Sequence, residues 1–369
     1  MPSMTRILLT GVGSPASQNV LSCLRMAPEP LHIVGCDVNP YHLEWGELDG
    51  RYLAPLTSDP GYLDWLNALI DREQIDFVHG QPDGEVAFLA AHAGDLHAKT
   101  FLPRPNVIAV AQDKFTSARI WQEFGLRADW ARPLRNAADL PREWRDYPLW
   151  LRATRGAGAK GSCKVMSYQH ADHWLKCWAY TQDDSRFMLQ EVLPGTEFAW
   201  HSLWWDGELV CSAAREYVEK PTSQHLGQAG VSSSYIVARS THRQDVNEVG
   251  EAAVRALDPH PHGTYGMDLR CDAQNVVRPT ECNAGRFKTT SLFLAMGGCN
   301  MPYWFVAIGM GSHERSLLRY NALPEGLLWI CHMDCQTVLV HQDELRAAML
   351  EALGETERQG GRSGGTDMP

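Results

Sequence analysis

The sequence lacks the features that would place it in a membrane or in an oxidising compartment. No apolar run approaches the about twenty residues that a membrane-spanning helix needs, and residues 1–10 show no signal-peptide pattern. The 10 cysteines include no pair separated by two residues, so neither a zinc ribbon nor a thioredoxin-type motif is supported. We therefore expect a cytoplasmic protein without membrane contacts, whose thiols are reduced and mostly buried.

Positive charge is also scarce. The chain has 33 Lys and Arg residues against 44 Asp and Glu residues, which gives a formal net charge of -11. A surface built mainly to hold nucleic acid needs the opposite balance, so we expect small-molecule partners and no nucleic acid. Hydrophobic residues make up 44% of the chain, and its 369 residues are enough for two or three packed units.

Two common catalytic patterns are missing as well. No Gly-x-x-x-x-Gly-Lys-Ser/Thr segment occurs, which disfavours P-loop kinase or GTPase chemistry. No convincing Ser-His-Asp or Cys-His arrangement can be traced, so a protein nucleophile is disfavoured too.

The first hundred residues alternate strand and helix patterns. Alternation of this kind predicts a parallel sheet covered by helices, and we expect residues 1–105 to form one such domain. The predicted elements, in chain order, are a strand at 6–10, a helix at 16–26, a strand at 31–36, a helix at 62–72, a strand at 75–79 and a helix at 84–93.

After residue 105 the pattern changes to paired strands, which predicts antiparallel lobes. We expect a linker helix at 113–124 and a small lobe with strands at 149–154, 162–167 and 187–191 within residues 106–195. A larger lobe is expected at 196–310, with hairpins 197–205/208–214 and 263–271/276–282 and a helix at 243–257. Residues 311–358 are predicted to form a C-terminal extension, and residues 359–369 a disordered tail.

A glycine-rich turn is predicted between two strands of the small lobe. It contains Gly156, Gly158, Lys160 and Gly161. Glycines let backbone amides approach phosphate oxygens, and a lysine adds a mobile positive charge. The turn is therefore a candidate phosphate-binding flap, although an ordinary flexible hairpin explains this stretch equally well.

A pair of predicted strands in the larger lobe carries a candidate metal site. Glu281 and Asn283 are two residues apart, so their side chains project from the same face of a strand. Asp268 joins them if the hairpin pairs in register. Two carboxylates and an amide oxygen suit Mg²⁺ or Mn²⁺, whereas an isolated Glu-x-Asn is more often a solvated strand face.

Two further groups of residues allow more than one interpretation. Gly11, Gly13 and Asp37 loosely match a dinucleotide-binding fingerprint, which Pro15 weakens. Asp83 and Glu85 follow a predicted strand, where they could meet a ligand, although capping of the next helix by Asp83 explains them equally well.

Taken together, these residues resemble the ATP-grasp superfamily, especially its carbamoyl-phosphate-synthase-like and carboxylate-amine ligase members. The likeness extends over nearly all of residues 5–310. Residues 7–19 are similar to the opening of that family's preATP-grasp domain, which explains a Rossmann-like start without NAD. The implied fold combines α/β and α+β parts: a parallel-sheet preATP-grasp domain followed by a two-lobed ATP-grasp fold.

The resemblance implies a set of nucleotide contacts. Lys114 matches the family's first nucleotide lysine, and Arg152 holds the position of the second basic contact, where lysine is usual. The glycine-rich turn would cover the phosphates. The hinge that reads adenine through its backbone and the ribose through a carboxylate matches Glu191, Val192, Leu193 and Glu197.

The same resemblance implies the chemistry. ATP and Mg²⁺ on Asp268, Glu281 and Asn283 would convert a carboxylate to an acyl phosphate, which an amine then attacks to form an amide or peptide bond with release of ADP and phosphate. The basic side chains expected to neutralise the developing charge are Lys160, Arg215 and Arg286. One departure is that Ala284 and Gly285 replace the proline of the family's Glu-x-Asn-Pro-Arg pattern.

Three alternatives stay open from the sequence. Carboxy-phosphate or carbamoyl-phosphate chemistry would use bicarbonate or carbamate as the acid. A nucleotide-binding regulatory module would bind without turnover, and an NAD-dependent oxidoreductase would use the glycines of the first turn. A homodimer is an expectation at the level of the family only.

Overall fold

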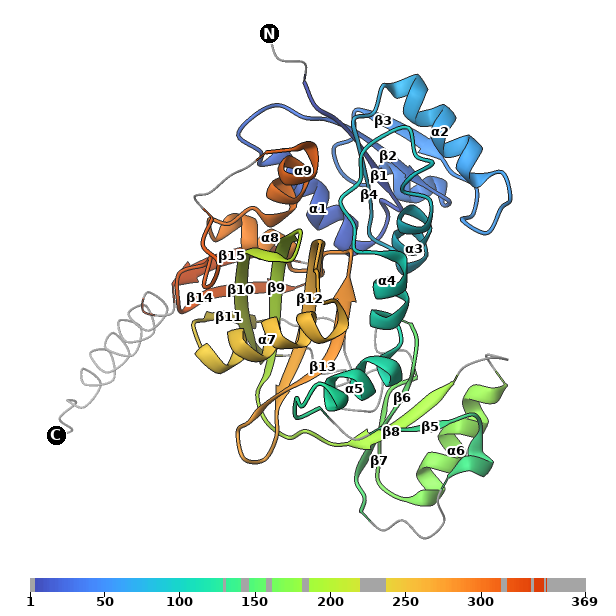
Figure 1. The fold of residues 1–369 in the computed structure, drawn as a ribbon, viewed down its shortest axis with the longest axis vertical. Helices are drawn as coiled ribbons and strands as arrows, with labels where there is room; N and C mark the ends of the chain where they lie inside the picture. The colour runs from blue at the N-terminus through green and yellow to red at the C-terminus, as the bar shows by residue number, and fades with distance from the viewer. Residues whose placement is uncertain are drawn as a thin grey trace, which may run out of the picture.

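The computed structural model describes residues 4–128, 131–140, 146–156, 161–180, 186–219, 237–312, 317–332, 335–341 and 343. Their strands form three separate sheets, two with four strands and one with seven. In Figure 1 the seven-stranded sheet lies in the middle of the molecule, between the N-terminal sheet and the second four-stranded sheet. Within the described residues, no helix has the length and apolar character needed to cross a membrane.

The first unit is a parallel sheet with helices on both sides. Alternate residues of its first strand enter different cores: Ile7 and Leu9 pack with the C-terminal helices, whereas Leu8 packs with Tyr62 and Leu66. The strands are β1 (Arg6–Thr10), β2 (His32–Asp37), β3 (Gly50–Leu53) and β4 (Phe77–Gly80), in the order β3-β2-β1-β4. The helices are α1 (Pro15–Arg25), the 3-10 helix η1 (Pro40–Glu44), α2 (Tyr62–Glu73) and α3 (Asp83–Ala91).

The central unit is an antiparallel sheet that supplies the floor of the candidate site. Its strands are β9 (Glu197–Trp205), β10 (Glu208–Glu219), β11 (Val237–Thr241), β12 (Gly263–Cys271), β13 (Val277–Ala284), β14 (Leu327–His332) and β15 (Cys335–His341). They lie in the order β13-β12-β9-β10-β11-β14-β15, so part of the C-terminal extension completes this sheet through β11. The predicted tail, residues 359–369, lies outside the described residues.

Two apolar cores hold the central sheet in place. One core is built on Trp200 and Trp204 and includes residues of α4 (Pro105–Ala111), α5 (Lys114–Glu123) and α7 (Gln244–Leu257). The other runs from Ile7 in β1 to Trp329 in β14 and includes α8 (Ser291–Met296) and α9 (Met301–Met310). Because the second core contains residues of both sheets, the first and central units are joined by shared apolar packing.

The third unit is a small antiparallel sheet with a core of its own. Its strands are β5 (Ala131–Leu134), β6 (Leu149–Ala153), β7 (Cys163–Val165) and β8 (Phe187–Glu191), in the order β5-β8-β6-β7. The 3-10 helix η2 (Ala137–Asp139) and α6 (Tyr168–Ala179) complete it. Leu151 and Leu189 belong to its core, as does Leu175 of α6, so α6 covers one face. The sequence patterns had not predicted β5 or α6.

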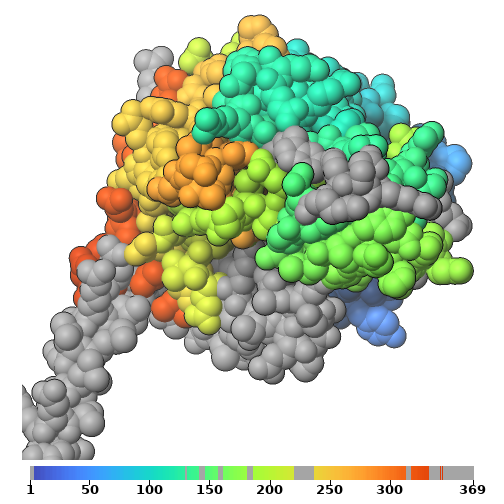
Figure 2. Space-filling model, turned by 90° about the horizontal axis from the view of Figure 1, so that it is seen from below, coloured from blue at the N-terminus to red at the C-terminus, as the bar shows by residue number. Residues whose placement is uncertain are grey.

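The opposite face of the small sheet turns toward the rest of the molecule. Side chains alternate along a strand, so Arg152 projects away from Leu151 and its helix-covered face. Seen from below, the teal residues of α4 and α5 border both the yellow and orange residues of the central unit and the green residues of the small unit (Figure 2). The candidate site lies where these three parts meet.

Candidate functional site

The hairpin of β12 and β13 brings the three candidate metal ligands to one face. Asp268 lies directly opposite Glu281, and Asn283 lies opposite Gly266. Since residues two apart share a face, Glu281 and Asn283 project on the same side as Asp268. The pairing that the sequence analysis required is therefore present.

Glu281 is contacted by basic side chains from two other elements. Its Oε1 lies 3.7 Å from Lys114 Nζ, and its Oε2 lies 3.5 Å from Arg152 Nη1. Lys114 is the first residue of α5 and also donates to the carbonyl of Gly156 at 2.8 Å. Asp113 fixes this end of the helix, because its carboxylate accepts a hydrogen bond from the backbone amide of Thr116 at 3.0 Å. Helix, small sheet and central sheet therefore meet at one carboxylate.

Asp268 has a different basic partner, which the sequence analysis missed. Lys288 Nζ donates to Asp268 Oδ1, and the hydroxyl of Tyr217 donates to the same oxygen at 3.3 Å. Burial lowers the pKa of Lys288, while its pairing with Asp268 opposes that effect. The sequence held a signal for both residues, because each lies two positions after a predicted site arginine and could share its face: Lys288 after Arg286, and Tyr217 after Arg215.

Arg286 reaches back to the strand that precedes it. It donates through Nη2 to Asn283 Oδ1, and its Nε lies 2.7 Å from Asp83 Oδ1 at the start of α3. Gly285, with φ +80°, provides the turn, and a Cβ there would lie 2.7 Å from Val86 Cγ1. The extra residue relative to the family pattern is thus accommodated. The capping interpretation of Asp83 is wrong, because the α3 N-terminus has no side-chain cap.

Arg215 lies on the same face, two strands away from Asp268. Ala199 of β9 separates them, since it pairs with both residues. Arg215 is 1% exposed and donates to the Thr290 hydroxyl. Nearby, burial first and then the charges of Arg215 and Lys288 hold the pKa of His201 well below its ordinary value. The face therefore contains a buried, strongly electropositive region beside the carboxylates.

The segment from β8 to β9 connects the small and central sheets, as expected for the hinge. Glu191 accepts from Arg278 Nη1 at its start, and Glu197 Oε1 lies 2.5 Å from Arg270 Nη1 at its end. Val192 and Leu193 follow Glu191 directly, and Leu193 is buried.

The glycine-rich turn is only partly described. Gly156 and Gly161 both have positive φ, at +105° and +69°, which are values that glycine adopts without strain. Gly158 and Lys160 lie outside the described residues.

At the turn after β1, Gly13 and Asp37 of the dinucleotide-binding alternative make structural contacts. Asp37 accepts from the backbone amides of Gly13 at 2.8 Å and Asn39 at 2.9 Å. A Cβ on Gly13 would lie 2.1 Å from His42 Nδ1, so the turn is packed against that ring. In this structure Asp37 closes the turn, which is the role of a structural acid rather than of a ribose contact.

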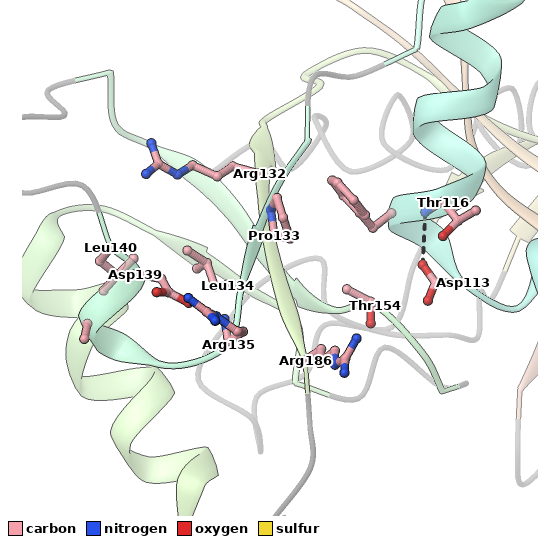
Figure 3. A pocket seen from close by; sticks show the side chains of 12 residues that line it. Asp113, Thr116, Arg132, Pro133, Leu134, Arg135, Asp139, Leu140, Thr154 and Arg186 are labelled. Carbon is pink, nitrogen blue, oxygen red and sulfur yellow. Dashed lines mark hydrogen bonds and ion pairs between the residues drawn. The ribbon is translucent and has the colours of Figure 1, made fainter.

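An open cavity of about 970 Å³ lies beside this cluster, at the N-terminus of α5. Figure 3 shows Arg132, Arg186 and Thr154 around it, together with the hydrogen bond from the Thr116 amide to Asp113. None of the candidate metal ligands lines it. The ion pairs of Glu281 with Lys114 and Arg152 join three elements, so we place the candidate site at the β12–β13 face. The cavity lies next to this face.

The donor set on that face fits a hard divalent cation. Two carboxylates and one amide oxygen of adjacent strands point the same way, and Mg²⁺ prefers such oxygen ligands. Among the described residues, no group of three or more His, Cys, Asp and Glu side chains converges, so the set depends on Asn283 as its third donor.

Three solved structures with a similar fold illustrate the comparison. The first is an L-amino acid ligase from Bacillus licheniformis, with a TM-score of 0.68 and 14% identity over 89% of this chain and 79% of that one. The second is a biotin carboxylase–beta-gamma-ATP complex from Campylobacter jejuni, with a TM-score of 0.66 and 14% identity over 89% and 75% of the two chains.

The third similar structure is N5-carboxyaminoimidazole synthase from Aspergillus clavatus in complex with ADP and 5-aminoimidazole ribonucleotide. Its TM-score is 0.66, with 14% identity over 89% of this chain and 82% of that one. No family model and no curated protein sequence matches the chain. At such low identity the likeness is one of fold.

Proposed function

We propose, from the premise that the chain has the ATP-grasp fold of its structural neighbours, that it is an ATP-dependent carboxylate-amine ligase. The observation that carries the proposal is the convergence of basic residues from several elements on the Asp268, Glu281 and Asn283 face. A fold hosts many functions, so this site, and not the fold alone, supports the assignment.

The nucleotide would lie between the small and central sheets. Lys114 and Arg152 would contact its phosphates, because both already reach the face that carries Glu281. The turn with Gly156, Gly158, Lys160 and Gly161 would cover the phosphates. The hinge formed by Glu191, Val192 and Leu193 would contact adenine, and Glu197 the ribose hydroxyls.

Asp268, Glu281 and Asn283 would hold Mg²⁺ or Mn²⁺, which spreads the charge of the phosphates when bound. Arg215, Arg286 and Lys160 would neutralise the charge that remains as the phosphoryl group moves. Arg286 is oriented for this by its ion pair with Asp83.

The reaction is written as two transfers. A carboxylate oxygen of the acid attacks the γ-phosphorus, so an oxygen–phosphorus bond forms, the bond to the β,γ-bridging oxygen breaks, and ADP leaves. An amine nitrogen then attacks the carbonyl carbon of the acyl phosphate. The carbon–nitrogen bond forms, inorganic phosphate leaves with the electron pair, and the amine proton passes to phosphate or water.

A second candidate activity is carboxy-phosphate formation, with bicarbonate as the acid. The likeness to a biotin carboxylase structure is the observation that favours it. The same face would serve, because bicarbonate is itself a carboxylate. The two activities differ in the acid that is consumed.

The experiment that tests the proposal is ADP release with Mg-ATP across a panel of carboxylic acids, each with and without pooled amines. ADP release that requires both partners is the expected result. Release with bicarbonate alone would shift the assignment to carboxy-phosphate chemistry. Nucleotide-dependent stabilisation without release for any acid would instead indicate a binding module and contradict the ligase proposal.

The metal assignment has its own test in Glu281→Ala. We expect this variant to lose Mg-dependent ADP formation by about 100-fold or more, since the central metal ligand is removed. Glu248→Ala is the matched control, because Glu248 is exposed on α7, where its carboxylate accepts a hydrogen bond from the Gln244 side chain at 2.6 Å. Circular dichroism checks that both variants are folded. Unchanged turnover in Glu281→Ala would reject the assignment.

A further inference from the structure

Lys288 pairs with Asp268 at the position where a metal ligand is expected to be available. We propose that Lys288 is an acid-substrate-binding residue: it neutralises Asp268 in the metal-free protein and turns to the substrate carboxylate when a divalent cation binds Asp268. The inference rests on the proposed function, because it assigns the acid to one end of that same site.

The path of the Lys288 side chain supports a specific contact. Its Cε lies 3.2 Å from the position that a Cβ would have on Gly266, so the stem crosses β12 where a glycine leaves room. Asp268 lies two residues further along β12, and its Oδ1 accepts from Lys288 Nζ. The Lys288 side chain is only 11% exposed, so solvent screens this pair weakly.

A divalent cation bound to Asp268 would weaken the ion pair between Asp268 and Lys288. The ammonium group and the cation would compete for one carboxylate and repel each other across a short distance. The neutral Tyr217 hydroxyl already donates to the same Asp268 oxygen, which leaves little capacity for a third partner at that atom. Lys288 would then be a buried cation in need of another anion.

The surroundings of Lys288 define the anion that it can accept. Arg215 lies on the same face, and the small side chain of Ala199 in β9 separates it from Asp268, the partner of Lys288. His201, next to Gly266 on this face, is held neutral and adds no further charge. A carboxylate placed between Lys288 and Arg215 would be neutralised from both sides and would lie beside the metal ligands. The position between Lys288 and Arg215 therefore suits the carboxylate of the acid substrate.

The two ends of the face would thus have different tasks. Glu281 meets Lys114 and Arg152 at the nucleotide end, whereas Asp268 meets Lys288 at the acid end. In-line attack requires the acid oxygen and the leaving oxygen to lie on opposite sides of the γ-phosphorus, so the acid and the nucleotide need separate ends of the site. This arrangement provides that separation.

The test compares Lys288→Met with the wild type in two independent measurements. Mn²⁺ binding to the ATP complex, followed by electron paramagnetic resonance without any acid, is expected to tighten about tenfold, because a competing cation is removed. The KM for the acid is expected to rise about tenfold while the KM for ATP stays within about twofold. Lys176→Met is the control, since that lysine pairs with Asp172 on the surface.

A second variant keeps the charge. Gly266→Ala is expected to shift both quantities in the same directions by a smaller factor, because the added methyl group would lie 3.2 Å from Lys288 Cε and 3.1 Å from the buried His201 ring, and the flexible lysine stem yields more easily than the ring. Unchanged or weaker Mn²⁺ binding in Lys288→Met overturns the inference, whatever the wild type turns over. Tighter Mn²⁺ binding with an unchanged KM for the acid overturns the substrate-binding role. Absence of ADP release by the wild type with every acid is a failure of the proposed function, and the Mn²⁺ measurement is independent of it.

Discussion

At the scale of single residues, the candidate site is defined by charges that are buried together. Lys114 and Arg152 are each 9% exposed, a burial that basic residues tolerate only with partners. Their shared partner is Glu281 in the central sheet, whereas Lys114 lies in α5 and Arg152 in the small sheet. The identity of each basic residue also matters, because Arg and Lys differ in geometry as well as in pKa.

Arg152→Lys tests that difference. Arg152 donates through Nη2 to the Thr280 carbonyl at 2.6 Å while Nη1 faces Glu281, a double contact that one ammonium group does not reproduce. We expect the KM for ATP to rise about tenfold, which corresponds to about 1.4 kcal/mol. Arg119→Lys, at an exposed pair with Glu123, is the control in the same steady-state assay. An unchanged KM would remove Arg152 from the nucleotide site.

His79 is a buried residue whose titration should affect stability. It is 1% exposed, neither ring nitrogen has a hydrogen-bond partner among the described residues, and burial lowers its pKa from 6.5 to about 3. The unfolded chain therefore takes up the proton first as the pH falls. Stability linked to neutral His79 is fully present above pH 6.5 and is lost progressively as the pH falls toward 3.

His79→Phe removes this titration and keeps a ring against Phe287 and Phe305. We expect a flatter dependence of the unfolding free energy on pH between 6.5 and 3, by an amount on the order of 4 kcal/mol over that interval. Urea titrations at several pH values measure it. Parallel pH profiles for the two proteins would show that His79 does not titrate as proposed.

At the scale of elements, the site depends on how helices and turns begin. Two local contacts set the position of Lys114. Asp113 caps the N-terminus of α5, and the backbone amide of Lys114 donates to the Thr154 carbonyl at 2.9 Å. At the other side of the site, the left-handed turn at Gly285 returns Arg286 to Asn283. Short local structures therefore control the placement of both basic residues.

Asp113→Ala separates capping from function. Loss of the cap is expected to cost about 1 kcal/mol of stability and to raise the KM for ATP, because the first turn of α5 carries Lys114. Ser167→Ala is the matched control, since Ser167 caps α6 in the same way at 3.2 Å from the His170 amide. We expect both variants to lose the same stability, and only Asp113→Ala to raise the KM for ATP. Equal KM values for the two variants would exclude the positioning role of the α5 cap.

At the scale of the whole molecule, the three sheets are joined by different forces. The first and central units share an apolar core, whereas the core of the small unit contains only its own residues. The contacts from the small unit to the central sheet include ion pairs, from Arg152 to Glu281 and from Glu191 to Arg278. Polar attachments of this kind leave a unit freer to move, so closure over the nucleotide is expected at this junction.

Hydrogen exchange tests that expectation. Mg-ATP should slow amide exchange several-fold in β6 and β8, because a ligand held between two units stabilises their closed arrangement, and should leave β1 and β4 nearly unchanged. In Glu281→Ala the slowing should be reduced. Uniform protection of all three sheets, or none in the small unit, would contradict a nucleotide site at this junction.

Much of the local structure could be predicted from sequence patterns. The strands at Arg6–Thr10, Phe187–Glu191, Glu197–Trp205 and Gly263–Cys271 have the predicted bounds, because apolar runs and turn residues mark strand ends directly. The misses have a physical cause too. β5 contains Pro133, which argues against a strand from sequence alone. In α6 the buried residues are only Ala171 and Leu175, a stripe too short to stand out in the sequence.

Local periodicity and spacing were enough to specify the alternation of the first unit, the hairpin that bears Asp268, Glu281 and Asn283, and the basic residues available to them. Tertiary structure alone decided the pairings. Lys288 with Asp268, Asp83 with Arg286, and Glu281 with Lys114 and Arg152 join residues that are distant in sequence. Such contacts arise only when separate cores pack and their buried charges need partners, and no local pattern records which partners those are.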